Sequence, residues 1–342
     1  MNLRIFLFLC IVWLVVIAAG CSRRVVDSEQ VSREEKIVIK FSHVVAENTP
    51  KGLAAQRFAN LVKERTGGRV EVQVFPNSVL YKDGEEIQAL QAGAVQMIAP
   101  ATSKLSLLYP QWQVFDLPYA FADEEAVHRA MESYLGKKLY DGLKANNLVP
   151  LSFWGSGFKQ MTNSVRPLIK PEDFQGLTFR VMINSQVLKR QFEKLGAHPV
   201  EGTFDNLYRV LESRAVDGEE NTLSNIFSKN FYKVQPYLTI SNHGYMGYVV
   251  MTNSEFWSSL PEDVRNILES TLQEVTEWEH EQALQINRDC LKQIISSGMV
   301  QVHYQTEDEK REWVRALRPL YEEFREIIGE DLIDYLEESR QE

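Results

Sequence analysis

Apolar and polar residues alternate along the first third of the chain with the periods of strands and helices. Residues 37–43 (IVIKFSH) and 69–75 (RVEVQVF) place apolar side chains at about every second position, which predicts two strands. Between them, Thr49-Pro50 is typical of a helix start, and Gly67-Gly68 of a helix end. A second helix over about 85–93 and a short apolar strand, VQMIA, complete a βαβαβ unit.

The same order of elements returns in the middle of the chain. Strands are predicted over 177–182 (LTFRVM) and 197–200 (AHPV), helices over 185–195 and 204–214, and the VDG segment closes the unit. Two βαβαβ units predict an α/β fold with two similar parallel-sheet lobes. Ligands of open α/β sheets bind beyond the carboxyl ends of the strands, so we expect a site in a cleft between the lobes.

The last third of the chain is mainly helical. Residues 238–252 predict extended segments that cross back between the lobes, and a helical pattern then runs from Pro261 to about Ser297. Such a helix of about 36 residues would be about 54 Å long, enough to pack along both lobes. Three further features are predicted: a capping-box start at Thr306 with Glu309, a helix break at Pro319, and a terminal amphipathic helix over 321–338.

The segment before the fold is typical of an export signal. Arg4 precedes an apolar run, Ile5–Ile17, and then Ala-Ala-Gly-Cys. The run is shorter than the about 20 residues that a membrane span needs. The four residues also resemble a bacterial lipobox, although Ala18 stands where the pattern prefers Leu. In a lipobox the cysteine, here Cys21, becomes the lipidated first residue and carries palmitate. The alternatives are an ordinary secretory signal and an uncleaved anchor, and each places the domain outside the cytoplasm.

The predicted organisation follows from these elements. The chain would comprise a lipoprotein signal peptide (1–20), a polar tether (21–36), a first lobe (37–155 plus about 248–285) and a second lobe (156–247 plus about 286–342).

Cysteine content and charge exclude several classes of protein. Beyond Cys10 and Cys21 only Cys290 remains, so a disulfide framework cannot form. One of the 37 Lys and Arg residues lies in the signal segment, which leaves 36 against 47 acidic residues. This balance argues against nucleic acid as a partner, but cations in a cleft can still attract an anion.

No catalytic or cofactor motif is present in the sequence. GxSxG, HExxH, CxxC, P-loop and GxGxxG patterns are absent, and the six His residues lack metal-ligand spacing. We therefore expect a binding protein, not an enzyme, without a metal or cofactor.

Five residues are candidates for ligand contact. A charged Arg180 on a buried strand is costly unless a carboxylate meets it, from a ligand or from an internal salt bridge. Lys159 lies in GSGFKQMTN, where glycines predict a loop close to a ligand, with a solvated surface lysine as the alternative. Asn221 is expected in a cleft loop or an ordinary turn, and His243 and Tyr245 in the cleft or in the core.

Several longer segments make one family recognisable. They are FSHVVAENTPKG, GGRVEVQVFPNSVLY, LQAGAVQMIAPATSKL, DLPYAF, FWGSGFKQMTN, GLTFRVM, AVDGEEN and SNHGYMGYVVM. From residue 37 to 336 the chain resembles solute-binding proteins of the tripartite ATP-independent (TRAP) transporters, in their C4-dicarboxylate-binding, DctP-like branch. The resemblance implies a two-lobed α/β fold like that of periplasmic binding proteins, with a cleft between the lobes and a long helix over both.

The resemblance also implies roles for particular residues. Arg180, in the GLxxRxM strand, would pair with a ligand carboxylate, Lys159 stands where many members have a second Arg, and Asn221 would hydrogen-bond the ligand. Members that bind sialic acid have an acidic residue in the loop that reads APATSK here, which favours a small organic dianion instead. Ser103 and Lys104 of that loop, and His43 near the predicted helix start, are further candidates for cleft contacts.

These expectations combine into one function. The chain is expected to be a lipid-anchored extracytoplasmic receptor that closes around succinate, fumarate or malate and docks on the membrane subunits of a TRAP permease. One alternative changes the ligand to a sugar acid, a 2-oxo acid or pyroglutamate. Another is a sensory co-receptor that presents a dicarboxylate to a membrane histidine kinase.

Overall fold

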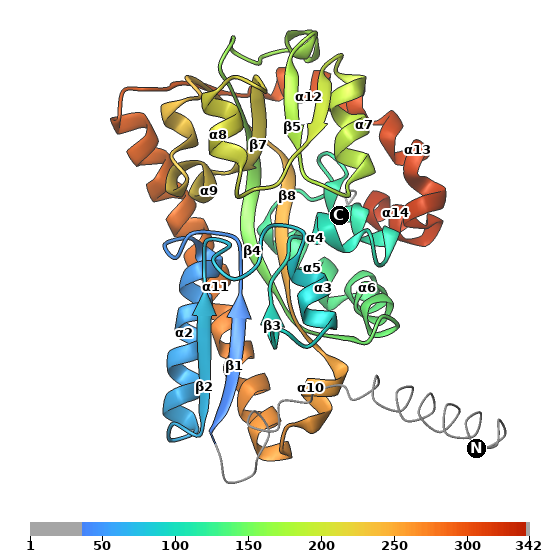
Figure 1. Cartoon of the computed structure of the whole chain (residues 1–342). Coiled ribbons are helices and arrows are strands. Elements are labelled where there is room, and N and C mark those ends of the chain that lie inside the picture. The colour runs from blue at the N-terminus through green and yellow to red at the C-terminus, as the bar shows by residue number, and fades with distance from the viewer. Residues whose placement is uncertain (1–35, 340–342) are drawn as a thin grey trace, which may run out of the picture.

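A single mixed sheet runs through the whole computed structural model, which describes residues 36–339 (Figure 1). The predicted signal peptide, Cys21 and all of the tether except Lys36 lie outside the described residues. None of the helices in the described range has the length and apolarity to cross a bilayer.

The first βαβαβ unit forms as predicted. It comprises β1 (Ile37–Ser42), α2 (Pro50–Arg65), β2 (Val70–Phe75), α3 (Glu86–Gln91) and β3 (Met97–Ile98). Strand β1 pairs in parallel with both β2 and β3. Thr49 caps α2, because its hydroxyl accepts a hydrogen bond from the Gly52 N–H at 3.2 Å and Pro50 takes the first helical position.

The second unit repeats this arrangement. It comprises β5 (Thr178–Val181), α7 (Gln186–Lys194), β6 (His198–Glu201), α8 (Leu207–Glu212) and β7 (Gly218–Thr222), followed by α9 (Leu223–Ser228). Strand β5 pairs in parallel with both β6 and β7. Asn221 lies inside β7, so the expected cleft loop or turn at this position is wrong.

Two long antiparallel strands, β4 (Leu148–Asn163) and β8 (Tyr237–Asn253), join the two units. The strand order is β2-β1-β3-β8-β4-β7-β5-β6, with β9 (Gln301–Tyr304) beside β8. The parallel lobe sheets that we predicted are therefore continuous through an antiparallel centre, and the two-lobed α/β fold is confirmed.

The loop predicted around Lys159 is wrong, because this residue lies in β4. The glycines that suggested a loop serve a different purpose. Gly157 has φ +107° at a register shift of the strand, and a Cβ on Gly155 would lie 2.3 Å from the hydroxyl of Tyr245. They allow a bulge and a close contact within a strand, not a turn.

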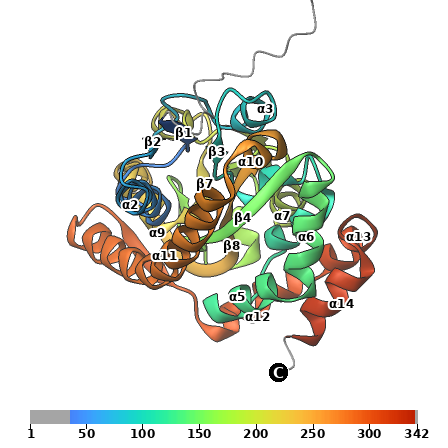
Figure 2. The same ribbon diagram turned by 90° about the horizontal axis from the view of Figure 1, so that it is seen from below.

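The long helix is confirmed as α11 (Glu262–Ser296), with 35 residues. Its buried side includes Val264, Leu272, Val275 and Ile294, and it packs against α2 of the first unit, the central strand β4 and α9 of the second (Figures 1 and 2). At 1.5 Å per residue it is about 52 Å long, so one helix supports both units.

The C-terminal helices differ from the prediction at one point. Thr306 and the break at Pro319 are confirmed, giving α12 (Glu307–Leu317) and α13 (Pro319–Ile328). The expected single terminal helix is wrong, since Gly329, at φ +105°, separates α14 (Glu330–Glu338) from α13. The other helical segments are α4 (Thr102–Leu105), η2 (Pro110–Asp116), α5 (Glu124–Glu132), α6 (Tyr134–Lys144), η3 (Pro171–Phe174), η4 (Phe231–Lys233) and α10 (Ser254–Ser259).

The cap of α2 gives a test of local stability. Thr49→Val removes the buried hydroxyl that accepts from Gly52 and donates to the Ala46 carbonyl at 2.7 Å. We expect a loss of about 0.5–2 kcal/mol in the free energy of unfolding, measured with urea. Thr49→Ser keeps the hydroxyl and serves as the control. Equal losses in the two variants would contradict a role for the cap.

Candidate functional site

A small buried cavity lies where the two units meet, with a volume of about 20 Å³. A cavity of about 10–15 Å³ already holds one water molecule, so a larger ligand requires the lining side chains to move apart. The apolar lining comes from Val44, Val45, Ala101, Met182, Phe204 and Met246. The polar lining comes from Asp83, Lys104, Arg180, Asn221, Asn225 and Tyr248.

Arg180 places a buried guanidinium at the cavity. It extends from β5 and is 3% exposed, and its Nε donates to the Gly202 carbonyl at 2.8 Å. Burial lowers the pKa of Arg180 to about 10, against the opposing charges of Glu219 and Glu220, so it stays protonated at neutral pH. No Asp or Glu within residues 36–339 forms an ion pair with Arg180. The internal salt bridge that was the alternative to a ligand carboxylate is therefore not formed by these residues.

Lys104, from α4, is the second cation of the lining, and it forms an ion pair with Asp83. The other carboxylate oxygen of Asp83 accepts a hydrogen bond from the Phe204 N–H at 2.8 Å. Burial, and then the charges of Lys51 and Arg180, lower the pKa of the Lys104 ammonium, whereas the contact with Asp83 favours its charged form.

Asn221 is held at the cavity wall by its neighbours. Its amide nitrogen donates to Glu219 Oε2 at 3.0 Å, and its oxygen accepts from Asn225 Nδ2 at 2.9 Å. Burial raises the pKa of the Glu219 carboxyl to about 7, although Asn221 and Arg180 oppose this shift. Glu219 thus fixes the orientation of an amide that can bond a ligand.

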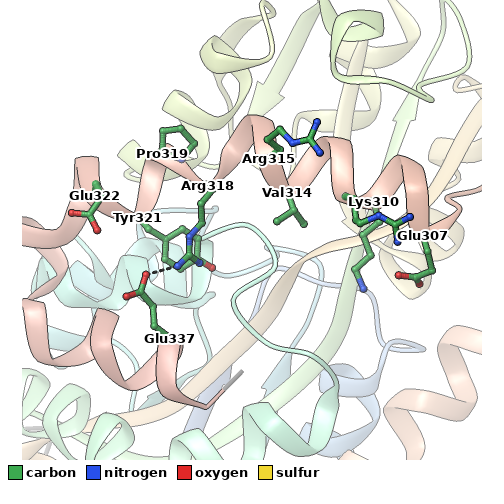
Figure 3. Close-up of a pocket in the computed structure, with 10 residues that line it drawn as sticks. Glu307, Lys310, Val314, Arg315, Arg318, Pro319, Tyr321, Glu322 and Glu337 are labelled. Atoms are coloured by element: carbon green, nitrogen blue, oxygen red, sulfur yellow. Dashed lines mark hydrogen bonds and ion pairs between the residues drawn. The ribbon is translucent and has the colours of Figure 1, made fainter. Parts of the chain in front are cut away.

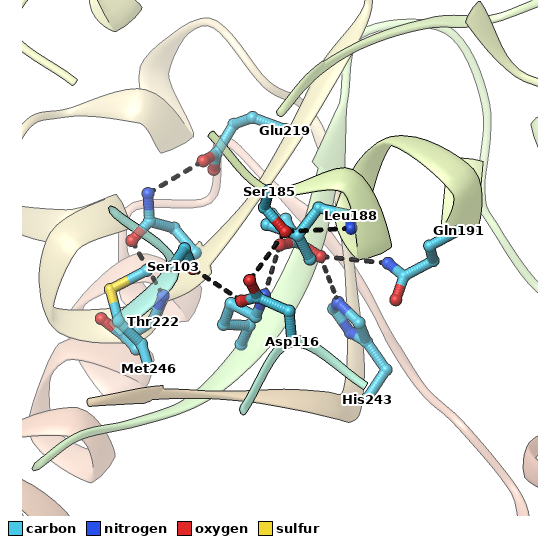
Figure 4. A network of polar contacts seen from close by, with 12 residues as sticks. Ser103, Asp116, Ser185, Leu188, Gln191, Glu219, Thr222, His243 and Met246 are labelled. Carbon is cyan, nitrogen blue, oxygen red and sulfur yellow. Dashed lines mark hydrogen bonds and ion pairs between the residues drawn. The ribbon is translucent and has the colours of Figure 1, made fainter. Parts of the chain in front are cut away.

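Lys159 lies in a polar network next to the cavity and does not line it. It is 0% exposed and pairs with Glu220, whose other oxygen bonds His243 Nε2 at 2.8 Å and accepts from Gln191 at 3.2 Å (Figure 4). Burial alone would raise the pKa of Glu220, but Lys159 and then His243 outweigh it and lower it to about 2. Lys159 is therefore not a solvated surface lysine, and the protein itself supplies the anion that compensates its charge.

A second buried carboxylate, Asp116, completes this region (Figure 4). It accepts hydrogen bonds from Ser103 Oγ at 2.6 Å and from Ser185 Oγ at 2.7 Å. Ser103 therefore points to an internal partner, and the structure does not bring it to the cavity lining.

The remaining two candidates lie elsewhere. His43 is fully buried, and burial followed by the charge of Lys51 lowers its pKa to about 3, so its imidazole is neutral. Tyr245 packs edge-on against Phe158 at 5.2 Å between ring centroids, within the core. Of the eight candidates, the cavity lining includes Arg180, Lys104 and Asn221.

Two charged residues near the cavity were missed from the sequence. Asp83 belongs to a YKDG segment, which is typical of a turn. Lys51 lies in the first turn of α2, where it donates to the Ala99 carbonyl at 2.8 Å and sits 3.6 Å from the ring centre of Tyr248. A helical lysine is ordinarily solvated, and only the fold reveals its burial.

A wider hollow of about 660 Å³ lies over α12, α13 and α14 (Figure 3). Its cations include Arg318, which pairs with Glu337 and stacks over Tyr321. Arg318 itself lies at the surface, where water screens its charge, so we place the site at the buried cavity instead.

Residues 41–327 match the family described as bacterial extracellular solute-binding protein, family 7. The chain belongs to this family. It is 48% identical over 321 residues to the C4-dicarboxylate-binding protein DctB of Bacillus subtilis (strain 168), covering 94% of this chain and 91% of that protein. It is 44% identical over 300 residues to the C4-dicarboxylate-binding periplasmic protein DctP of Rhodobacter capsulatus, covering 87% and 90%.

A solved structure agrees with this assignment. The chain superposes with a TM-score of 0.87 and 39% identity on a TRAP periplasmic solute-binding protein from Shewanella oneidensis with bound succinate, covering 89% of this chain and 99% of that one. Membership of family 7 confirms the predicted TRAP-type solute-binding fold. It also confirms a binding function in place of an enzymatic one.

The Lys159–Glu220 pair gives a test of the network. Lys159→Met leaves a buried carboxylate without its cation, and we expect a loss of about 3–5 kcal/mol in the free energy of unfolding by urea. Adding Glu220→Gln should restore much of it. Because the folded pKa of Glu220 is depressed, the pair stabilises the wild type above about pH 4.5 and this contribution is lost toward pH 2. A single variant as stable as the wild type at pH 7 would contradict the pairing.

Proposed function

We propose that this chain is an extracytoplasmic solute-binding protein that captures C4-dicarboxylates such as succinate, fumarate or malate. The observation that carries the proposal is the buried Arg180 at the cavity, without an ion-pair partner among residues 36–339. An Arg fork binds a carboxylate through two parallel hydrogen bonds. The names of the DctB and DctP relatives, and the succinate in the Shewanella protein, support the same class of ligand.

The second carboxylate of the ligand is assigned to Lys104 instead of Lys159. Both ammonium groups are buried and paired with an internal carboxylate, but Lys104 lines the cavity and Lys159 lies beside it. Asn221 also lines the cavity and can bond either end of the ligand. Lys159 then supports the site indirectly, by holding Glu220 in the neighbouring network.

Binding requires the two units to separate and close again. Several contacts bridge them in this conformation, including Ser106 Oγ to the Asn184 carbonyl at 2.6 Å and Lys229 Nζ to Asn77 Oδ1 at 2.9 Å. A ligand that contacts both units favours the closed form, because only a difference in affinity shifts such an equilibrium.

The partner is the membrane part of a TRAP permease, and the chain is held at the membrane by a lipid on Cys21. We favour transport over presentation to a sensor kinase because the succinate-bound neighbour is itself described as a TRAP periplasmic solute-binding protein. The Ala-Ala-Gly-Cys segment at 18–21 supports the lipid anchor.

Arg180 can be tested by calorimetric titration with succinate after unfolding and refolding to remove carried-over ligand. We expect Arg180→Met to weaken binding by at least about 30-fold, because the ligand carboxylate loses its cation. Arg190→Met, which removes a surface Arg paired with Glu323, is the control and should bind normally. A folded Arg180→Met protein with unchanged affinity would exclude this site.

Cys21 can be tested by cell fractionation. Cys21→Ala should move the protein from the membrane to the soluble extracytoplasmic fraction, because the lipid attachment is lost. Cys290→Ala, which changes a buried thiol of α11, should leave the protein at the membrane. Membrane retention of the Cys21 variant would instead indicate an uncleaved apolar anchor.

A further inference from the structure

The charges that line the cavity do not match a dianion. Arg180 and Lys104 are cations and Asp83 is an anion, with exposures of 3%, 3% and 4%. The lining therefore carries one net positive charge, whereas a C4-dicarboxylate carries two negative charges. Because an unpaired buried charge is costly, the second carboxylate of the ligand has to share or take the cation that Asp83 already holds.

Asp83 occupies a position that a ligand carboxylate would use. One oxygen pairs with the Lys104 ammonium, and the other accepts from the Phe204 N–H at 2.8 Å. Asp83 belongs to the loop between β2 and α3, and Phe204 to the loop between β6 and α8. A single internal carboxylate thus joins a cation of the first unit to a main-chain donor of the second, at the wall of the cavity.

We propose that Asp83 is a specificity-determining residue, which competes with the second carboxylate of the ligand for Lys104. The inference rests on the proposed function. A monocarboxylate of the same length needs Arg180 alone and leaves the Asp83–Lys104 pair intact. A dicarboxylate has to displace Asp83 from Lys104. Asp83 therefore lowers the affinity for dicarboxylates, and it reduces the ratio of this affinity to the affinity for monocarboxylates.

The variant Asp83→Asn separates charge from shape. It keeps an oxygen that can accept from Phe204, but it removes the negative charge beside Lys104. Purified full-length protein, refolded to remove carried-over ligand, is titrated with succinate and with butyrate. We expect succinate to bind roughly 10-fold tighter to the variant, since Lys104 is released for it, and butyrate to change by less than about twofold.

Two further variants identify the cause of the change. Asp141→Asn removes one negative charge from a surface pair with Lys144, and it should alter neither affinity. Adding Lys104→Gln to Asp83→Asn removes the cation for which the two carboxylates compete, and it should abolish the gain for succinate. Circular dichroism and thermal melting establish that each protein is folded.

The outcomes separate this inference from the proposed function. If the wild type binds succinate and Asp83→Asn binds it no tighter, or gains equally for butyrate, Asp83 is a structural partner of Lys104 and only the inference falls. If neither protein binds a C4-dicarboxylate, the proposed function falls and the inference falls with it. A selective gain for succinate that depends on Lys104 supports both.

Discussion

The cost of burying charge governs the region where the two units meet. Lys159, Lys104 and Arg180 are all excluded from water, together with Glu220 and Asp83. An isolated ion in such surroundings would cost many kcal/mol, so each must have a partner of opposite charge or a ligand that supplies one. Lys159 and Lys104 have internal carboxylates, whereas no Asp or Glu among residues 36–339 forms an ion pair with Arg180. The guanidinium of Arg180, which has no carboxylate partner in that range, is therefore available for the carboxylate of a ligand.

The central sheet gives the Lys159 network fixed positions. Lys159 is on β4, which pairs with β7 on one side and with β8 on the other. Glu220 and Asn221 are on β7, and His243 is on β8. Lys159 lies directly opposite Thr222 on β7 and Gly244 on β8, so main-chain hydrogen bonds set its place. Residues on paired strands are more rigid than residues on loops, which suits a site that has to distinguish one small anion from another.

Local features of the fold could be predicted from the sequence, and pairings between distant residues could not. The cap at Thr49, the break at Pro319 and the long helix each follow from a local pattern of residues in their own segment of the chain. The glycines near Lys159 misled because a bulge and a turn need the same backbone freedom. Arg180 and Asn221 line the cavity, but the partners of Lys159 and Lys104 lie 61 and 21 residues away, and no local pattern reports them.

Gly155 on β4 lies directly opposite Gly247 on β8, in the two long strands that join the units. A Cβ on Gly247 would lie 2.2 Å from the ring of Phe153, and one on Gly155 would meet Tyr245, so neither position has room for a side chain. At this point of the sheet β4 and β8 thus pack without side chains on either glycine. For protein engineering, this gives two facing junctions for chimeras: the segment between Gly155 and Gly247 could be exchanged for that of a relative with another acid as ligand, leaving both main chains in register.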